Sequence, residues 1–458
     1  MTTLTRPADP SDLGRHFRGR ILSATDPGYD RARTVWNAMI DRRPALIAQC
    51  GDAADVAAAV RHARQHNLEI AVRGGGHSVQ GNALAEGGLV VDLRGMRDVT
   101  VDPDARTVRV EGGATIGDLD RGTQPFGLAT TGGRVSTTGV GGFALGGGTG
   151  WLDRKFGLAC DNLVSVELVT AAGEQVVASE REHPELFWAL HGGGGNFGVA
   201  TALTFRLYEL ATVTAALMVC EPESGPEVVR VFRDLLTDAS DDVGGGVMYA
   251  TGPEEEFVPE QLHGRLSLLV LVVVAGGRDV ALPQLRALLD LRPVGIMVEE
   301  LPYADFQCML DDPPGHRNYW SAEHLSSLPD AAVDAFHGAV APMIVPSASQ
   351  HVLFAAGGAA GRESSDYPVP WRRAPWVVHP FALWTDPADD DRARRWAREV
   401  RAAVKPWATG DIYLNFITDE GADRVRAGYG PAWPRLAAVK REWDPDNVFH
   451  LNHNVTPA

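Results

Sequence analysis

A histidine follows three consecutive glycines in the run Arg73–Ser78, which reads RGGGHS. A neutral imidazole has a free nitrogen lone pair at about pH 7, so His77 has the chemistry of a nucleophile. Consecutive backbone N–H groups without side chains can form a nest that holds a pyrophosphate. No helical pattern and no GK[ST] sequence follows, so the run is neither the dinucleotide fingerprint nor a P-loop. Taken alone, it fits an ordinary turn with a turn histidine as well as a cofactor site.

Glycine and short polar residues recur in three later segments. Residues 132–150 read GGRVSTTGVGGFALGGGTG, and the Val, Phe and Leu among the glycines indicate an ordered loop against a flat object. Residues 191–199 read HGGGGNFGV, and YLNF at 413–416 precedes the polar closing segment NVFHLNHNV. A strand followed by RGGGHS and by further glycine-bearing loops is a backbone-donor arrangement, because consecutive N–H groups without side chains can hold an anion.

The pattern of glycine loops, strands and helices that would position these segments changes along the chain. Glycine-bearing loops become rarer after about residue 207, where strands begin to alternate with helices as in α+β proteins. This secondary-structure pattern changes again near residue 408. We therefore predict an α+β protein with boundaries near these two residues. The expected helices are 52–67 with Asp52 as N-cap, 115–126, 183–190, 227–237, 280–291, 331–340, 389–404 and 432–443, and the expected strands are 69–72, 89–93, 107–110, 162–170, 175–178, 200–207, 245–250, 266–275, 296–300, 352–356, 377–383 and 412–417.

Charge and composition exclude several classes of partner. The 458 residues carry a formal net charge of -17, which argues against a nucleic-acid partner or an anionic membrane surface. The four cysteines form no CxxC pair, and we assign no metal ligands. The N-terminus has no apolar signal region, and the longest apolar run, 266–275, is too short to cross a bilayer. We expect a soluble, cytoplasmic protein.

Five motifs occur in a fixed order: RGGGHS, the segment 135–150, KFGLACDNL followed by PELFWALHGGGGNFGV, YLNF, and DPDNVF with NHN. In this order they resemble the FAD-linked oxidases of the vanillyl-alcohol oxidase superfamily, in the berberine-bridge-enzyme-like branch. The resemblance extends from about residue 28 to residue 458. It is highly specific for the family and poorly specific for the substrate.

The resemblance implies a two-part FAD-binding domain, residues 1–207 completed by residues 408–458. It also implies an inserted substrate domain, residues 208–407, built on an antiparallel sheet covered by helices. His77 matches the histidine that members bond to the flavin 8α-methyl carbon, so a covalent 8α-histidyl FAD is expected. The residues expected at the cofactor are Arg73, Gly74, Gly75, Gly76, His77, Ser78, Thr137, Thr138, Gly139, Gly142, Gly146, Val199, Tyr413, Asn415, Asn452 and Asn454.

Many members attach the flavin a second time, through a cysteine. Matching their GVGG sequence to Gly139–Gly142 puts Val135 at that position, so His77 is expected to be the single link. Cys160 lies some twenty-five residues further on, and we interpret it as a small buried thiol beside a strand.

The proton acceptor is harder to assign. Members that oxidise alcohols often use the second tyrosine of Y-x-N-Y, which is Phe416 here. If 412–417 is a strand, Tyr413 and Asn415 share one face and Phe416 takes the other. Arg317–Trp320 resembles the R-x-Y-W stretch that lies near the substrate in members of the family. The candidate catalytic residues are Tyr413, Tyr319, Gln350 and His351, with His324 as a further possibility.

We predict an FAD-linked oxidoreductase that takes hydride from a C–H next to oxygen or nitrogen. Its substrate is expected to be a small, ring-containing natural product, and O2 is expected to be reduced to H2O2. Loss of the family tyrosine favours amines modestly, because a neutral amine needs no strong base. The family implies secondary metabolism, such as antibiotic biosynthesis. Two alternatives stay open: a flavin-dependent oxygenating or oxidative-cyclising enzyme, and a non-catalytic flavin- or drug-binding protein. A monomer or homodimer is expected.

Overall fold

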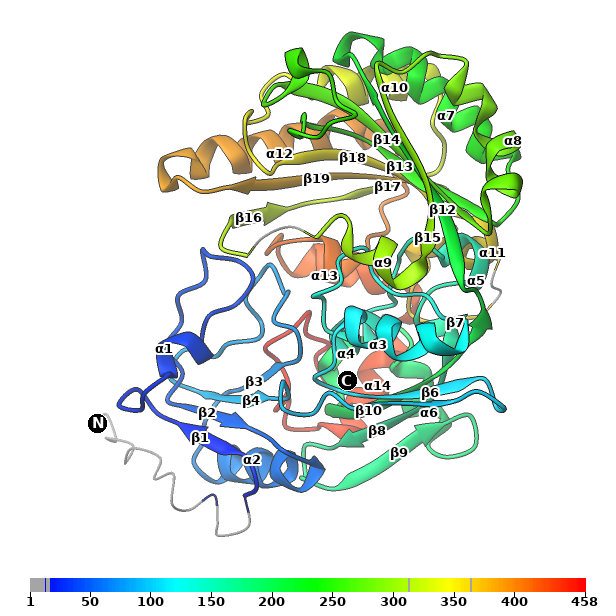
Figure 1. The fold of residues 1–458 in the computed structure, drawn as a ribbon. Coiled ribbons are helices and arrows are strands. Elements are labelled where there is room, and N and C mark those ends of the chain that lie inside the picture. Colours follow the sequence, from blue (N-terminus) through cyan, green and yellow to red (C-terminus); the bar gives the residue numbers. More distant parts are fainter. Residues whose placement is uncertain (1–12, 14–16, 312–313, 363–364) are drawn as a thin grey trace.

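The computed structural model describes residues 13, 17–311, 314–362 and 365–458. Figure 1 shows two parts: a lower part that carries the N-terminal half and the C-terminal segment, and an upper part built on one large sheet. The mixed α+β architecture predicted from the sequence is confirmed. The boundaries near residues 207 and 408 stay predictions.

A small sheet of four strands positions the RGGGHS run. Three of its strands are parallel and almost entirely buried, and the fourth, at one edge, pairs antiparallel. The Asp52 carboxylate caps the helix that follows the second strand by accepting from the Asp55 N–H at 2.9 Å. The sheet has the order β1 (Arg20–Leu22), β2 (Leu46–Gln49), β4 (Leu89–Asp92), β3 (Ile70–Arg73), and the helix is α2 (Ala53–Gln65).

A second, antiparallel sheet carries the later glycine segments. Hydrophobic side chains of its central strands form a core with the neighbouring short helices and with the C-terminal segment. The strand order is β5 (Val99–Asp102), β6 (Thr107–Glu111), β10 (Val199–Arg206), β8 (Leu163–Val169), β9 (Gln175–Ser179), and a separate pair joins β7 (Leu128–Ala129) to β11 (Tyr208–Glu209). The helices of this half of the chain are α1 (Tyr29–Ala32), α3 (Ile116–Thr123), α4 (Val140–Leu145), α5 (Asp153–Phe156) and α6 (Pro184–Ala189).

The upper part is an antiparallel sheet with long helices on its outer face (Figure 1). The predicted buried strand over 266–275 is confirmed at both ends by β14. The order is β15 (Gly295–Pro302), β12 (Thr212–Cys220), β14 (Leu266–Ala275), β13 (Val243–Thr251), β18 (Gln350–Ala355), β19 (Trp376–Trp384), β16 (Arg317–Trp320), with β17 (Glu323–Leu325) also on β19. The helices are α7 (Gly225–Asp238), α8 (Arg278–Leu289), α9 (Tyr303–Cys308), α10 (Asp330–Gly338), α11 (Gly358–Arg362) and α12 (Asp390–Val404).

The C-terminal segment, α13 (Ala422–Tyr429) and α14 (Trp433–Trp443), returns to the lower part of the molecule (Figure 1). The fully buried Lys440 ammonium donates to the Asp444 carboxylate at 2.6 Å and to the Asn196 carbonyl at 2.7 Å. Such a buried charge is tolerated because it is paired and hydrogen-bonded. The segment therefore completes the N-terminal half across a long stretch of sequence, which gives the two-part domain.

Two local predictions are wrong. Residues 412–417 are not a strand, because Leu414–Phe416 form a 3-10 turn in which the Phe416 N–H donates to the Tyr413 carbonyl at 3.0 Å. The alternation argument therefore fails, and the Phe416 ring meets the Tyr413 ring edge-on at 4.7 Å. The glycine segment is not only loop, since α4 forms within it. Within the described ranges, no helix is long and apolar enough to cross a membrane.

Candidate flavin site

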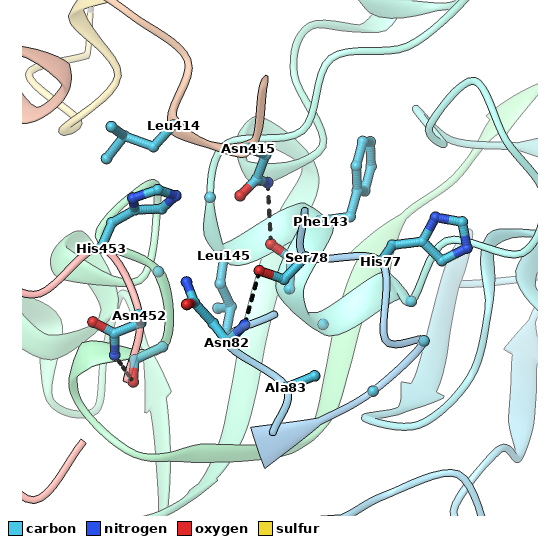
Figure 2. Close-up of a pocket in the computed structure, with 18 of the residues that line it drawn as sticks. His77, Ser78, Asn82, Ala83, Phe143, Leu145, Leu414, Asn415, Asn452 and His453 are labelled. Atoms are coloured by element: carbon cyan, nitrogen blue, oxygen red, sulfur yellow. Dashed lines mark hydrogen bonds between the residues drawn. The ribbon is translucent and has the colours of Figure 1, made fainter. Parts of the chain in front are cut away.

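A cavity of about 320 Å³ lies between the glycine loops, the C-terminal segment and the upper sheet. The run Gly74–Ser78 lines it, together with Thr138, Gly139, Gly142 and Gly146 of the predicted cofactor residues. Figure 2 shows His77 and Ser78 on one loop, with Asn415, Asn452 and His453 entering from the C-terminal segments. Segments that are far apart in the sequence therefore form one site.

Close backbone contact explains two of the glycines. A Cβ at Gly75 would lie 2.3 Å from the Gly139 nitrogen, and a Cβ at Gly139 would lie 2.3 Å from the Gly75 nitrogen. Within the described residues, the backbone N–H groups of 74–78 donate no hydrogen bond to backbone or side chains, so they are free to hold an anion. A Cβ at Gly142 or Gly195 would meet no protein atom within 4 Å, although both residues line the cavity. The cavity is thus a smooth cradle that side chains would partly fill.

His77 is held in a defined orientation. Its ring stacks on the Trp36 ring at 4.3 Å with planes 20° apart. Its Nε2 lies 2.9 Å from the Thr137 hydroxyl oxygen, and Nδ1 takes no part in this hydrogen bond. Burial lowers the pKa of His77 to about 4, so the imidazole is neutral at neutral pH. An oriented, neutral imidazole is the form that can act as a nucleophile.

The C-terminal segments contribute hydrogen-bonding groups. The Asn415 amide donates to the Tyr413 hydroxyl at 3.0 Å. It also donates to the Gly142 carbonyl at 3.3 Å, the bond drawn from Asn415 in Figure 2. Side-chain oxygens of Asn452 and Asn454 are buried without a hydrogen-bond partner among the described residues, but only Asn452 of the two lines the cavity. Buried acceptors of this kind need donors, and the hydroxyl groups of a dinucleotide cofactor can supply them.

Some predicted cofactor residues have indirect positions. The buried Arg73 guanidinium donates to the carbonyls of Ala32 and Thr34, so it fixes the loop and does not line the cavity. Val199 is buried in a strand between the cavity-lining residues Gly198 and Ala200. Thr137 reaches the site through its contact with His77.

Three predicted catalytic residues lie outside the cavity lining. His351 points to the helix-covered side of β18, where its Nε2 contacts the Phe336 carbonyl at 2.9 Å. Tyr319 packs in the same core with Arg398 over its ring at 5.7 Å, whereas its neighbour Trp320 lines the cavity. Gln350 starts β18, pairs with Phe381 and does not line the cavity either. Alternation along the strands turns His351 and Tyr319 toward the helix-covered face. Gln350 shares the face of its partner Phe381, but at the start of β18 it lies outside the cavity lining.

Tyr413 does line the cavity and is fully buried. Burial raises its pKa to about 12, so the phenol is neutral at neutral pH. His324 is buried beside the Trp371 ring and lies outside this cavity. Val135 lines the cavity, whereas Cys160 is fully buried outside the lining and its thiol pKa is raised by burial.

Sequence reasoning missed the wall that the upper sheet and YLNF turn build. Trp320, Phe381 and Phe416 line the cavity, and the Trp320 and Phe381 rings meet edge-on at 4.9 Å. Arg134, within the glycine segment, also lines it. Behind this wall the buried His379 ring stacks on Phe381 at 3.6 Å. The available signal was the side-chain alternation of strands whose pairing the sequence alone does not reveal.

Comparison with known proteins identifies the family. A family model described as "FAD binding domain" matches residues 44–179, and one described as "Berberine and berberine like" matches residues 412–456. The (R)-6-hydroxynicotine oxidase of Paenarthrobacter nicotinovorans is 34% identical over 460 residues, covering 96% of this chain and 97% of that protein. The chain belongs to the berberine-bridge-enzyme-like FAD-linked oxidases. The family predicted from the motifs is thereby confirmed.

Solved structures of the berberine-bridge-enzyme-like family show the same fold. The 6-hydroxy-D-nicotine oxidase of Arthrobacter nicotinovorans has a TM-score of 0.87 and 31% identity, with 98% of this chain and 100% of that chain covered. BBE-like 1 of Physcomitrella patens has a TM-score of 0.85 at 23% identity, over 96% of this chain and 97% of that chain. The glycine cradle, the free N–H groups and the unpartnered asparagine oxygens fit FAD. The chain is an FAD-linked oxidoreductase with a two-part FAD-binding domain.

Proposed function

We propose that this oxidoreductase is an oxidase that removes hydride from a C–H next to nitrogen or oxygen in a small, ring-containing molecule. The observation that carries the proposal is one cavity lined both by the His77 loop and by the aromatic wall. When bound there, FAD accepts two electrons from the substrate and passes them to O2, which yields H2O2. The residues of the chain bind, orient and shield the reacting groups.

His77 is proposed to be the single covalent attachment to the flavin. Trp36 and the Thr137 hydroxyl hold the imidazole in place, and its lowered pKa keeps a lone pair free. Val135 stands in the cavity lining at the position matched to the second link, and a valine side chain cannot form it. The glycines beside His77 let the backbone approach the flavin and its pyrophosphate.

Of the two substrate classes, we propose that a C–H next to nitrogen is modestly favoured over a C–H next to oxygen. An alcohol needs its hydroxyl proton removed as hydride leaves, whereas a neutral amine needs no strong base. Phe416 cannot accept a proton, and the neighbouring phenol of Tyr413 is held neutral by its raised pKa. Among the described residues that line the cavity there is no aspartate or glutamate. Tyr413 and Asn415 are therefore proposed to orient the substrate.

Acid precipitation followed by peptide mass mapping tests the attachment. Yellow colour in the pellet and an FAD adduct on the His77 peptide alone are expected. Colour released into the supernatant would contradict the covalent bond, and an adduct on the Cys160 peptide would contradict the single link. A His77→Ala variant provides the matched control, because its flavin is expected to leave with the acid supernatant.

Peroxide stoichiometry tests the reaction. One H2O2 formed per substrate oxidised is expected for an oxidase. Substoichiometric peroxide together with labelled oxygen from O2 in the product would instead indicate an oxygenating enzyme. Steady-state loss of the oxidised flavin absorbance on addition of a substrate separates either enzyme from a protein that only binds flavin.

A further inference from the structure

The described side chains that line the cavity carry one formal charge at neutral pH. Of its described lining residues, Arg134 is the single Arg, Lys, Asp or Glu. Burial lowers the pKa of His77 and of His453 to about 4, so both imidazoles are neutral. Burial also holds the pKa of Tyr413 above its usual value, at about 12. A ligand bound in this cavity therefore contacts a cationic side chain. No anionic side chain among the described lining residues could pair with a positive charge on the ligand.

Arg134 is seated between rings and is only partly neutralised. Its guanidinium carbon lies 4.1 Å from the centre of the Phe354 ring and 5.3 Å from that of Trp151. It donates to the Gly150 carbonyl at 3.1 Å and more weakly to the Thr149 hydroxyl at 3.4 Å. The Asp153 carboxylate is 3.7 Å away and accepts hydrogen bonds from Thr149 and Gly150.

The guanidinium has hydrogen-bonding capacity left over. Its Nε is buried without a partner among the described residues, and 14% of the side chain is exposed. An arginine is always protonated in proteins, so the burial of an incompletely paired guanidinium carries a cost that an acceptor group in the cavity would offset. Planar N–H donors suit carboxylate-like and carbonyl oxygens best.

A cluster of aromatic rings lies beside this cation. The Phe381 ring lies 6.2 Å from the Phe416 ring, and Phe354, which Arg134 covers, lies 6.4 Å from each of them. Rings at these distances pack against further rings in offset or edge-on arrangements. These rings and the guanidinium together suit a ligand that has an aromatic ring and a polar oxygen substituent.

We propose that Arg134 selects substrates whose ring carries an anionic or strongly hydrogen-bond-accepting oxygen, and disfavours cationic ring compounds. The proposal rests on the proposed function in that it places the oxidase substrate in this same cavity. Any amine that is oxidised there binds in its neutral form, since an ammonium group would face Arg134 and no carboxylate among the described lining residues. Arg134 is then a specificity-determining residue of the reaction.

Calorimetric titration of the anaerobic holoenzyme with three ring probes tests the proposal. The probes are benzoate, neutral benzamide and benzylammonium, which share a ring and differ in charge. We expect benzoate to bind about 10- to 100-fold more tightly than benzylammonium, because hydrogen bonds to charged groups are the stronger ones. Equal binding, or tighter binding of benzylammonium, would overturn the proposal without any variant being needed.

Variants locate the effect. Arg134→Gln is expected to abolish the preference for benzoate, and Arg134→Lys to retain part of it. Arg109→Gln removes an equal charge from the half-exposed pair with Glu167 and is expected to change nothing. Undiminished benzoate preference in Arg134→Gln would overturn the proposal, as would a loss of FAD from it, which would assign Arg134 to the cofactor. Binding is measured without turnover, so a failed peroxide assay contradicts the proposed function alone.

Discussion

Gly142 offers a sharp test of where the flavin lies. It is in the middle of α4, it lines the cavity, and a Cβ built on it would meet no protein atom within 4 Å. Gly142→Ala is therefore expected to cause no clash within the protein. Gly338, the last residue of α10, is the matched control, because it also has open space at its Cβ and does not line the cavity.

The two substitutions should change the free energy of unfolding alike but should change the affinity for FAD differently. Glycine to alanine at a compatible helical position stabilises by about 0.4–1 kcal/mol, and we expect both variants to show this or a smaller gain. A ligand in van der Waals contact with Gly142 would have to yield to an extra methyl group. Overpacking costs about 1–3 kcal/mol, which corresponds to an FAD Kd about 5- to 150-fold higher for Gly142→Ala alone.

The assay uses a His77→Ala background, in which FAD is expected to exchange freely. FAD titration of the flavin-free protein gives the Kd, and urea unfolding of the same samples gives the free energy of unfolding. If Gly142→Ala binds FAD as tightly as Gly338→Ala, the cofactor does not rest on α4 and the cradle is misassigned. If Gly142→Ala unfolds more easily than its parent, the space around that residue is not open to the protein.

Three further results are expected. Thr137→Val removes the hydroxyl beside Nε2 of His77 and should lower the fraction of flavin that stays with acid-precipitated protein; an unchanged fraction would show that this contact does not prepare the imidazole. Burial lowers the pKa of His351 to about 4, so the unfolded chain binds more protons between about pH 6.5 and pH 4 and the free energy of unfolding falls as the pH falls through that window. Urea unfolding at several pH values should show a shallower fall in His351→Gln, by at most about 1.4 kcal/mol per pH unit, and an identical slope would contradict the burial argument. Lys440→Met leaves the fully buried Asp444 carboxylate without its cation and should lower the free energy of unfolding by about 3–5 kcal/mol; a loss below about 1 kcal/mol would mean that water reaches the pair.

Local signals in the sequence predicted much of the fold. The ten apolar residues Leu266–Ala275 form a strand with the same ends, because a fully buried strand has no polar positions to blur its limits. Asp52 caps its helix as expected, since capping depends on neighbouring residues alone. The strand predicted over 412–417, which contains YLNF, was wrong. Its polar and apolar residues alternate as in a strand, but packing of Asn415 on Gly142 and Gly146 favours a 3-10 turn.

The substrate side of the site was harder to predict for a physical reason. Residues of β19 are buried on both faces, one against helices and one against the flavin-binding half, so hydrophobic alternation does not tell the two faces apart. Trp320 and Tyr319 are adjacent aromatic residues, and only the pairing register sends the first into the cavity. Motif resemblance located the cofactor loops, which lie on backbone positions that glycine marks. It did not locate Arg134, whose role depends on rings contributed by other strands.

The tether at Asn196 has a consequence for how the chain is made. The buried Asn196 side chain donates to the His453 carbonyl at 3.1 Å and accepts from the Val455 N–H at 2.9 Å, across 257 and 259 residues of sequence. A ribosome therefore synthesises the entire substrate part between the two halves of the flavin site. Until His453 and Val455 have emerged, the glycine loops lack the C-terminal residues that complete the cavity, so we expect nascent chains to retain no cofactor. Flavin capture is thus expected to follow completion of synthesis, and prematurely terminated chains are expected to stay colourless.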